Sequence, residues 1–219
     1  PTDPTIDVPL IDPDNAYYYG NSQGGIMGGA YIALSPDIHR ATLGVPGTPY
    51  HLLLSRSADF DPFFLIFKTM YPDPVDIQFI LAMNQTLWDP GEASGYVHAV
   101  NTAPLADTAP KEVLLHAAIG DAQVTTLGAH VMARAYGASL IEDPVRPVWG
   151  LETADSGHTG SALVEYDYGL EEPIENIPPD ANEDPHGKPR KDAAGQEQMH
   201  HFFETGVVHH ICEGPCSGS

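Results

Sequence analysis

Ser22 lies at the centre of a Gly-x-Ser-x-Gly pattern that it forms with Gly20 and Gly24. The aromatic residues 17–19 predict a strand before the pattern, and the small residues 26–34 predict a helix after it. A serine on a sharp strand-to-helix turn has a strained backbone, and flanking glycines leave room for the strand and the helix. Its hydroxyl then lies at a helix N-terminus, where backbone amides can stabilise an oxyanion. The pattern predicts a nucleophilic serine; the alternative is a Gly-rich turn that only opens a helix.

This strand, turn and helix resemble the nucleophile elbow of the α/β-hydrolase superfamily, whose catalytic residues follow in the order serine, acid, histidine. The apolar run 112–119 predicts a further buried strand, two strands after the one before Ser22, and Asp121 follows it closely. Open α/β sheets collect functional groups at the carboxyl ends of their strands. The resemblance therefore implies that Asp121 is the acid of the triad. The alternative role for Asp121 is to cap the helix predicted over 124–136.

The superfamily places its general base on the loop between the last strand and the last helix. The sequence predicts these elements over 161–168 and 193–204, and His186 lies between them. His186 is therefore the expected base, with His200 or His201 as the main alternative. The other histidines considered lie inside a predicted strand, before the last strand or after the last helix: His116, His158, His209 and His210.

Together these residues imply an acyl-transfer site that needs no cofactor. His186 would take the proton of Ser22, Asp121 would fix the imidazole tautomer, and the amide of Gln23 would bind the oxyanion. The expected function is a serine hydrolase that cleaves small-molecule carboxylic esters through an acyl-enzyme intermediate. The alternatives are a peptidase, thioesterase or acyltransferase that uses the same residues, and a catalytically silent binding or scaffold protein.

The expected fold is one α/β domain over residues 1–219, with a mostly parallel, doubly wound sheet of the α/β-hydrolase type. The predicted strands are 15–20, 40–46, 112–119 and 161–168. Residues 51–104 exceed what one crossover requires and predict a small helical cap. Within it, the helix expected over 73–88 has apolar residues near one face, which indicates a modest apolar substrate pocket: Phe79, Ile80, Met83, Leu87 and Trp88.

Only residues 1–15 precede the elbow strand, which is too few for the four strands and crossovers that the superfamily has upstream. The chain thus resembles the C-terminal half of an α/β-hydrolase, and its second oxyanion donor is unassigned. An uncovered strand edge is unfavourable. We expect a second polypeptide carrying the upstream strands, or a second copy in a homo-oligomer, to cover it. Residues 5–10 are the alternative cover, which the prolines at 4, 9 and 13 disfavour.

The charge balance restricts the partners. The chain has 30 acidic and 9 basic residues, a formal net charge of −21. Nucleic acids and anionic membranes need a basic face, so both are poor partners. The acidic, Pro-rich residues 171–184 predict a solvated loop, with a calcium site as the alternative. No stretch of the sequence approaches the apolar length of a membrane span.

Cys212 and Cys216 are the two cysteines of the chain. Four residues apart and separated by Gly-Pro, they predict a small disulfide loop. Zinc binding together with His209 and His210 is the alternative. A disulfide favours an extracytoplasmic or secreted location.

Overall fold

The computed structural model describes residues 2–3, 8–9, 12 and 15–218. Its centre is a six-stranded sheet in the order β3–β4–β5–β9–β6–β7, and all five neighbouring pairs are parallel. The strands are β3 (Tyr17–Asn21), β4 (Arg40–Gly44), β5 (Glu112–Ala118), β6 (Ser139–Ile141), β7 (Thr153–Ala154) and β9 (Ala162–Tyr166). The expected α/β class with a parallel sheet is therefore confirmed.

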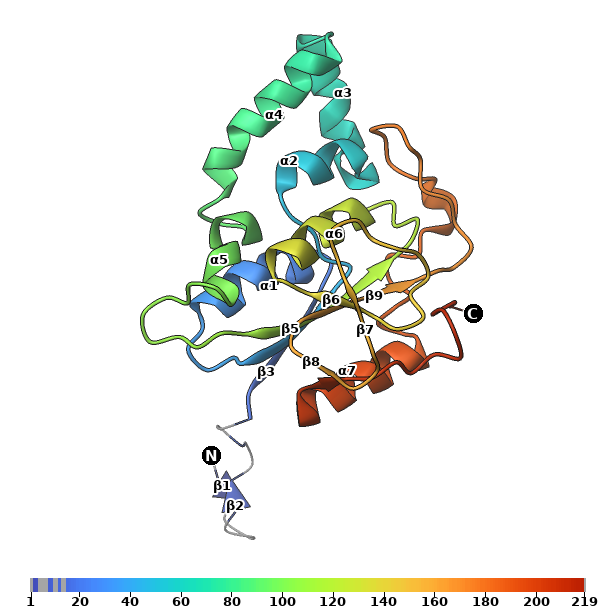
Figure 1. The fold of residues 1–219 in the computed structure, drawn as a ribbon. Coiled ribbons are helices and arrows are strands. Elements are labelled where there is room, and N and C mark those ends of the chain that lie inside the picture. The colour runs from blue at the N-terminus through green and yellow to red at the C-terminus, as the bar shows by residue number, and fades with distance from the viewer. Residues whose placement is uncertain (1, 4–7, 10–11, 13–14, 219) are drawn as a thin grey trace.

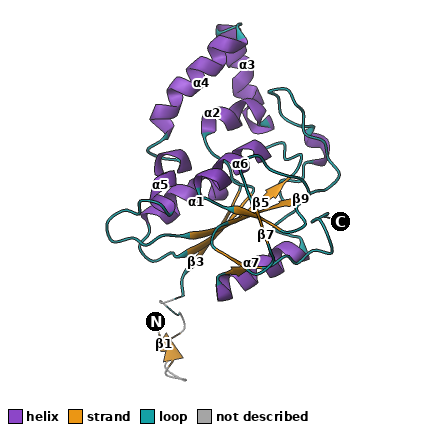
Figure 2. Ribbon diagram, viewed as in Figure 1, coloured by secondary structure: helices purple, strands orange, loops and turns teal. Residues whose placement is uncertain are grey.

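Helices cover both faces of this sheet (Figure 1). One face carries α1 (Gln23–Leu34), α5 (Val97–Val100) and α6 (Thr126–Ala135), and the other carries α7 (Ala193–Thr205) (Figure 2). Side chains alternate accordingly along β5. Val113 and Leu115 belong to the core under α1 and α6, whereas Leu114 belongs to the core with Phe202 of α7. A strand buried on both faces reads as a continuous apolar run, which is why β5 was predictable.

The four predicted strands are all present, with ends shifted by a few residues. The sequence did not predict β6 and β7, which have three and two residues. Strands this short contain too few residues for a recognisable pattern. Their presence places β9 between β5 and β6, although β6 precedes β9 in the chain.

Between β4 and β5 the chain forms a helical insertion in the region where a cap was expected. It contains α2 (Tyr50–Leu53), α3 (Asp61–Met70) and α4 (Pro74–Trp88), and the 3-10 helices η1 (Leu54–Arg56), η2 (Ala58–Phe60) and η3 (Ala93–Tyr96). Figure 1 shows α3 and α4 as a hairpin that projects away from the sheet.

Five residues of α4 were expected to form an apolar face that lines a pocket, and three of them are exposed. Phe79, Met83 and Leu87 of α4 are 60–75% exposed. The buried side chains of α4 are instead Ile77, Leu81 and Gln85, successive residues one turn apart, because this other stripe of the helix faces inward. The hairpin consequently presents a row of large exposed apolar side chains: Phe63, Leu65, Ile66, Met70, Val75, Phe79, Met83 and Leu87.

The elbow strand β3 is an edge strand. Among the described residues it pairs with β4 on one side and with no strand on the other. Tyr17 stacks on Phe203 at a ring-centroid distance of 5.1 Å. Exposed apolar side chains flank the free edge on both faces of the sheet: Tyr17 and Tyr19 on β3, and Met27, Tyr31 and Leu34 on α1.

Short antiparallel pairs form near the two ends of the chain. Near the N-terminus β1 (Thr2–Asp3) pairs with β2 (Val8–Pro9), and near the C-terminus β8 (His158–Thr159) pairs with β10 (Val207–Val208). The remaining 3-10 helix is η4 (Ala181–Glu183). In the part of the chain that the structure describes, no helix has the length and apolar character needed to cross a bilayer.

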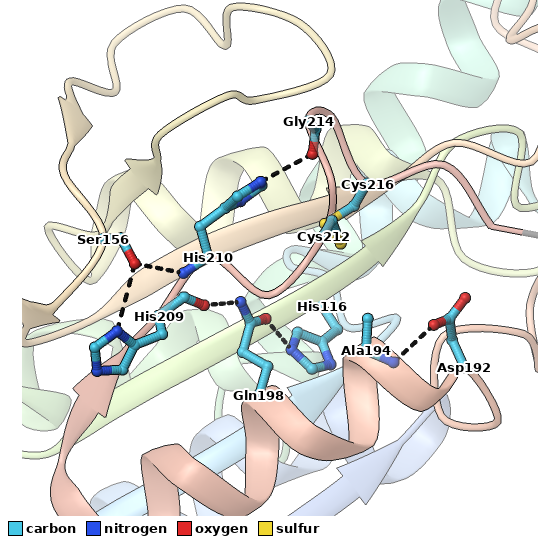
Figure 3. The surroundings of a disulfide bond; sticks show 10 residues. All are labelled: His116, Ser156, Asp192, Ala194, Gln198, His209, His210, Cys212, Gly214 and Cys216. Carbon is cyan, nitrogen blue, oxygen red and sulfur yellow. Dashed lines mark hydrogen bonds between the residues drawn. A yellow bond between two sulfur atoms is a disulfide. The ribbon is translucent and has the colours of Figure 1, made fainter.

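The C-terminal tail is closed by the predicted disulfide. Cys212 and Cys216 are joined with an S–S distance of 2.02 Å, which rules out the alternative in which these thiols bind zinc. The tail then lies along β9, because the amide of Asp167 donates to the carbonyl of Cys216 at 2.9 Å. Figure 3 shows the loop held by His210, whose Nε2 is 2.8 Å from the carbonyl oxygen of Gly214. A disulfide is compatible with an extracellular location.

Candidate active site

Ser22 occupies the turn between β3 and α1 in a backbone conformation that non-glycine residues seldom adopt. Its φ and ψ are 60° and −126°. The turn is fixed by the amide of Ser22, which donates to the carbonyl of Gly44 at 2.9 Å, and by its carbonyl, which accepts from Gly25 and Ile26. A strained residue of this kind persists only where its surroundings over-determine it, and such residues cluster at functional sites.

Packing around Ser22 requires one of the two glycines that were expected, and one that was not. A Cβ on Gly20 would lie 2.2 Å from the carbonyl oxygen of Gly24, so Gly20 is needed, as expected. A Cβ on Gly24 would meet only the Tyr18 hydroxyl, at 3.8 Å, so the expectation that packing requires Gly24 is wrong. Gly25 is the second constrained position, because its Cβ would lie 2.6 Å from the carbonyl oxygen of Gly44.

Gln23 is the first residue of α1. The first amides of a helix have no intrahelical acceptor, so the amide of Gln23 is free to bind an oxyanion beside Ser22. The side chain of Gln23 has a separate contact, because its Nε2 donates to the Tyr50 hydroxyl at 2.7 Å. This hydrogen bond joins the elbow to the first helix of the insertion.

Asp121 follows β5 after a two-residue turn and is 1% exposed. Its Oδ1 accepts hydrogen bonds from the amides of Gln123 and Val124, both at 2.9 Å. The helix cap weighed as its alternative role belongs instead to Thr125, whose side chain accepts from the amide of Leu127. Burial raises the pKa of Asp121, and the hydrogen bonds from His186 and these two amides act in the opposite direction.

His186 is paired with Asp121 through its Nδ1, at 2.8 Å from Oδ2 and 3.0 Å from Oδ1. A carboxylate only accepts, so Nδ1 carries the proton and Nε2 keeps its lone pair. Nε2 is buried and has no hydrogen-bond partner among the described residues. This is the tautomer and orientation that a general base requires.

Several charges act on the pKa of His186. Burial alone would lower it, but the hydrogen bond to Asp121 and the negative charges of Asp121, Asp184 and Asp59 outweigh burial. The pKa of His186 is therefore raised above its ordinary value, because these carboxylates favour the imidazolium.

A cavity of about 160 Å³ lies beside Ser22. Its walls come from the elbow, from the insertion and from the turn after Asp121, and they consist of Ser22, Gln23, Ile26, Tyr50, Leu53, Leu54, Ser57, Asp59, Phe60, Gln123 and Val124. Ligand pockets for drug-sized molecules run to roughly 300–1,000 Å³, so this cavity suits a small group.

The four predicted site residues form two groups in the structure, one that contains Asp121 and His186 and one that contains Ser22 and Gln23. Asp121 and His186 are in direct contact, and Ser22 and Gln23 line the adjacent cavity with Gln123. Within the described residues, no hydrogen bond joins Ser22 Oγ to His186 Nε2. Catalytic hydrogen bonds are often long before substrate binds and tighten in the complex.

The competing histidines all have other partners. His116 is buried on β5, donates to Gln198 at 2.9 Å, and burial lowers its pKa to about 4 (Figure 3). The others contact backbone carbonyls, Ser156 or Glu204: His158, His200, His201, His209 and His210. None of these side chains hydrogen-bonds Asp121, as His186 does, and neither they nor His186 line the cavity at Ser22.

Asp184 is a site residue that the sequence interpretation missed. Its carboxylate accepts from the amide of His186 at 3.1 Å, from the amide of Ala122 at 3.2 Å and from Gln123 Nε2 at 2.8 Å. It therefore fastens the histidine loop to the turn after Asp121. The available signal was an Asp two residues before a histidine, a spacing at which Asp side chains commonly bond the backbone.

Metal chemistry was an alternative for the acidic loop 171–184. Across the described part of the chain, no group of three or more His, Cys, Asp and Glu side chains is arranged to hold a metal ion. Glu172 of this loop instead pairs with Arg146 at 2.7 Å.

Comparisons with protein-family models, with curated proteins and with solved structures find no match for this chain.

Proposed function

We propose that this protein is a serine hydrolase that cleaves carboxylic esters of small molecules. The observation that carries the proposal is the strained backbone of Ser22 at a helix N-terminus, in the wall of a cavity. The buried His186–Asp121 pair next to that cavity supports it, because a serine hydroxyl is a weak nucleophile without a base.

The reaction would run in two halves. His186 Nε2 takes the proton of Ser22 Oγ as the oxygen attacks the ester carbonyl, and the resulting oxyanion is stabilised by the amide of Gln23. The carbon–oxygen bond to the alcohol then breaks, and the imidazolium returns the proton to the leaving alcohol. Water, deprotonated by the same nitrogen, then attacks the acyl-enzyme. The bond from the acyl carbon to Ser22 Oγ breaks, the imidazolium returns its proton to Oγ, and the acid is released.

Covalent labelling tests this proposal directly. A fluorophosphonate probe is expected to modify Ser22, located by peptide mass spectrometry, because the probe needs an activated serine hydroxyl. Ser35→Ala, at the other end of α1, is the matched control and should be labelled like the wild type. Absence of labelling at Ser22 would favour the silent binding or scaffold protein. Labelling without ester turnover would favour a peptidase, thioesterase or acyltransferase.

We also propose that a second polypeptide covers the free edge of β3 by adding a strand. Backbone groups buried without partners cost about 1–3 kcal/mol each, and paired edges avoid this cost. Residues 5–10 were the alternative cover, and of these the structure describes Val8 and Pro9, which pair with β1. Two copies of a chain with a net charge of −21 repel each other, so a different polypeptide is favoured over a homo-oligomer.

Native mass measured with an intact-mass inventory of the sample tests the added strand. The expected result is a complex heavier than 23.5 kDa that contains a second polypeptide. A monodisperse 23.5 kDa species that is fully active on esters would contradict the proposal.

A further inference from the structure

The cavity beside Ser22 has one charged side chain in its wall. Asp59 of η2 contributes a carboxylate, and the other ten residues that line the cavity are uncharged. Asp59 makes no hydrogen bond or ion pair with any other residue that the structure describes. Its charge is therefore available to a ligand.

Aromatic rings share this cavity with Asp59. Tyr50 and Phe60 both line it, and Tyr50 is held edge-on against Trp88 at a centroid distance of 5.8 Å. Ring faces attract cations through their quadrupole, and organic ammonium groups are commonly bound where aromatic rings and a carboxylate meet. The cavity volume of about 160 Å³ accommodates a small group of this kind.

We propose that this cavity selects esters that carry a small ammonium group, with Asp59 as the residue that determines this specificity. The inference rests on the proposed ester hydrolysis at Ser22 and names its substrate class. The ammonium group would occupy the space between the Asp59 carboxylate and the rings of Tyr50 and Phe60. An anionic substrate would be rejected at the same place, because no basic side chain of the described residues lines the cavity to offset Asp59.

Asp59 also acts on His186, since its charge helps to raise the pKa of that residue. A change at Asp59 can thus alter turnover of every substrate through the base. A ratio of rates for two substrates cancels this common effect. The ratio changes only if Asp59 distinguishes the charge of the substrate itself.

The experiment uses two pairs of esters. In one pair the alcohol is choline or its uncharged carbon isostere, 3,3-dimethylbutanol, each as the acetate. In the other pair the acyl group carries either a trimethylammonium group or a tert-butyl group. For each pair the ratio of kcat/KM, cationic over neutral, is measured at fixed pH and low salt in the wild type, Asp59→Asn, Asp59→Glu and Asp61→Asn.

We expect the wild-type ratio to exceed one in at least one pair, and to fall about fivefold in Asp59→Asn, as for loss of one partly solvated charge a few ångströms away. Asp59→Glu keeps the charge and should retain most of the preference. Asp61→Asn is the matched control, because Asp61 is exposed, as Asp59 is, but does not line the cavity. Added salt should reduce the wild-type ratio.

Ratios at or below one in both pairs, or a ratio that Asp59→Asn leaves unchanged, would overturn the inference. Either outcome is evidence against the inference only when the fluorophosphonate labels Ser22 of the same protein sample. A chain that is folded by circular dichroism but not labelled refutes the proposed hydrolysis instead. The two failures are therefore distinguishable.

Discussion

Alanine in place of Ser22 is expected to lower kcat for ester hydrolysis by roughly 10⁴- to 10⁶-fold, because no other group can form the acyl-enzyme. His186→Ala should cost about as much, since the hydroxyl then has no base. Asp121→Asn should cost about 10⁴-fold, because an amide can hold the imidazole in the wrong tautomer. Combined variants should be scarcely worse than the single ones, since the three residues act as a unit.

Steady-state kinetics on a chromogenic acetate ester measure these effects, with circular dichroism to show that each variant is folded. His200→Ala is the matched control for the histidine, because His200 lies exposed on α7 and its ion-pair partner within the described part of the chain is Glu204, at 3.5 Å. Full activity in His186→Ala together with loss of activity in His200→Ala would show that His200, and not His186, is the base.

The pH profile of kcat/KM should have an acidic limb whose midpoint lies above about 6.5, the ordinary pKa of histidine. The base works only when Nε2 is unprotonated, and the carboxylates around His186 hold its pKa above the ordinary value. Activity should therefore rise with pH, about tenfold per unit below the midpoint, and level off above it.

Removing a nearby negative charge should shift that midpoint downward. Asp184→Asn and Asp59→Asn each delete a carboxylate that favours the imidazolium, whereas Asp61→Asn deletes one with no such effect on His186. The midpoints are compared at one ionic strength, because salt screens these charges. A wild-type midpoint below 6.5, or an equal shift in Asp61→Asn, would contradict the assignment of His186 as the base.

The parts of the fold that could be predicted are those with strong local patterns. The apolar runs of β4 and β5, the small residues of α1 and the Gly-x-Ser-x-Gly turn all gave the element that the structure contains. The pairing of Asp121 with His186, 65 residues apart, followed from the family resemblance and the rule that functional groups lie at the carboxyl edge of a parallel sheet.

Other parts of the fold and of the site depend on tertiary contacts, which local sequence patterns do not indicate. The buried stripe of α4 was wrongly predicted because the helix is apolar on several sides, and its contacts with α2 decide which side faces inward. Asp59 and Asp184 are two of thirty acidic residues, and only the fold shows that the charges of both act on His186. The short strand β6 could not be predicted, because its three residues show no strand pattern of their own. It forms a strand because it pairs with β9.

The placement of β9 sets the order in which the sheet can be completed during synthesis. Leu163 is the register partner of Leu115 on one side and of Leu140 on the other, so β9 alone joins the β3–β4–β5 half of the sheet to the β6–β7 half. A nascent chain that has emerged only as far as β7 holds two incomplete half-sheets, each with an unpaired inner edge. Such edges invite pairing with other chains. Until residues 162–166 emerge from the ribosome, the inner edges of β5 and β6 therefore lack the strand that pairs with both of them.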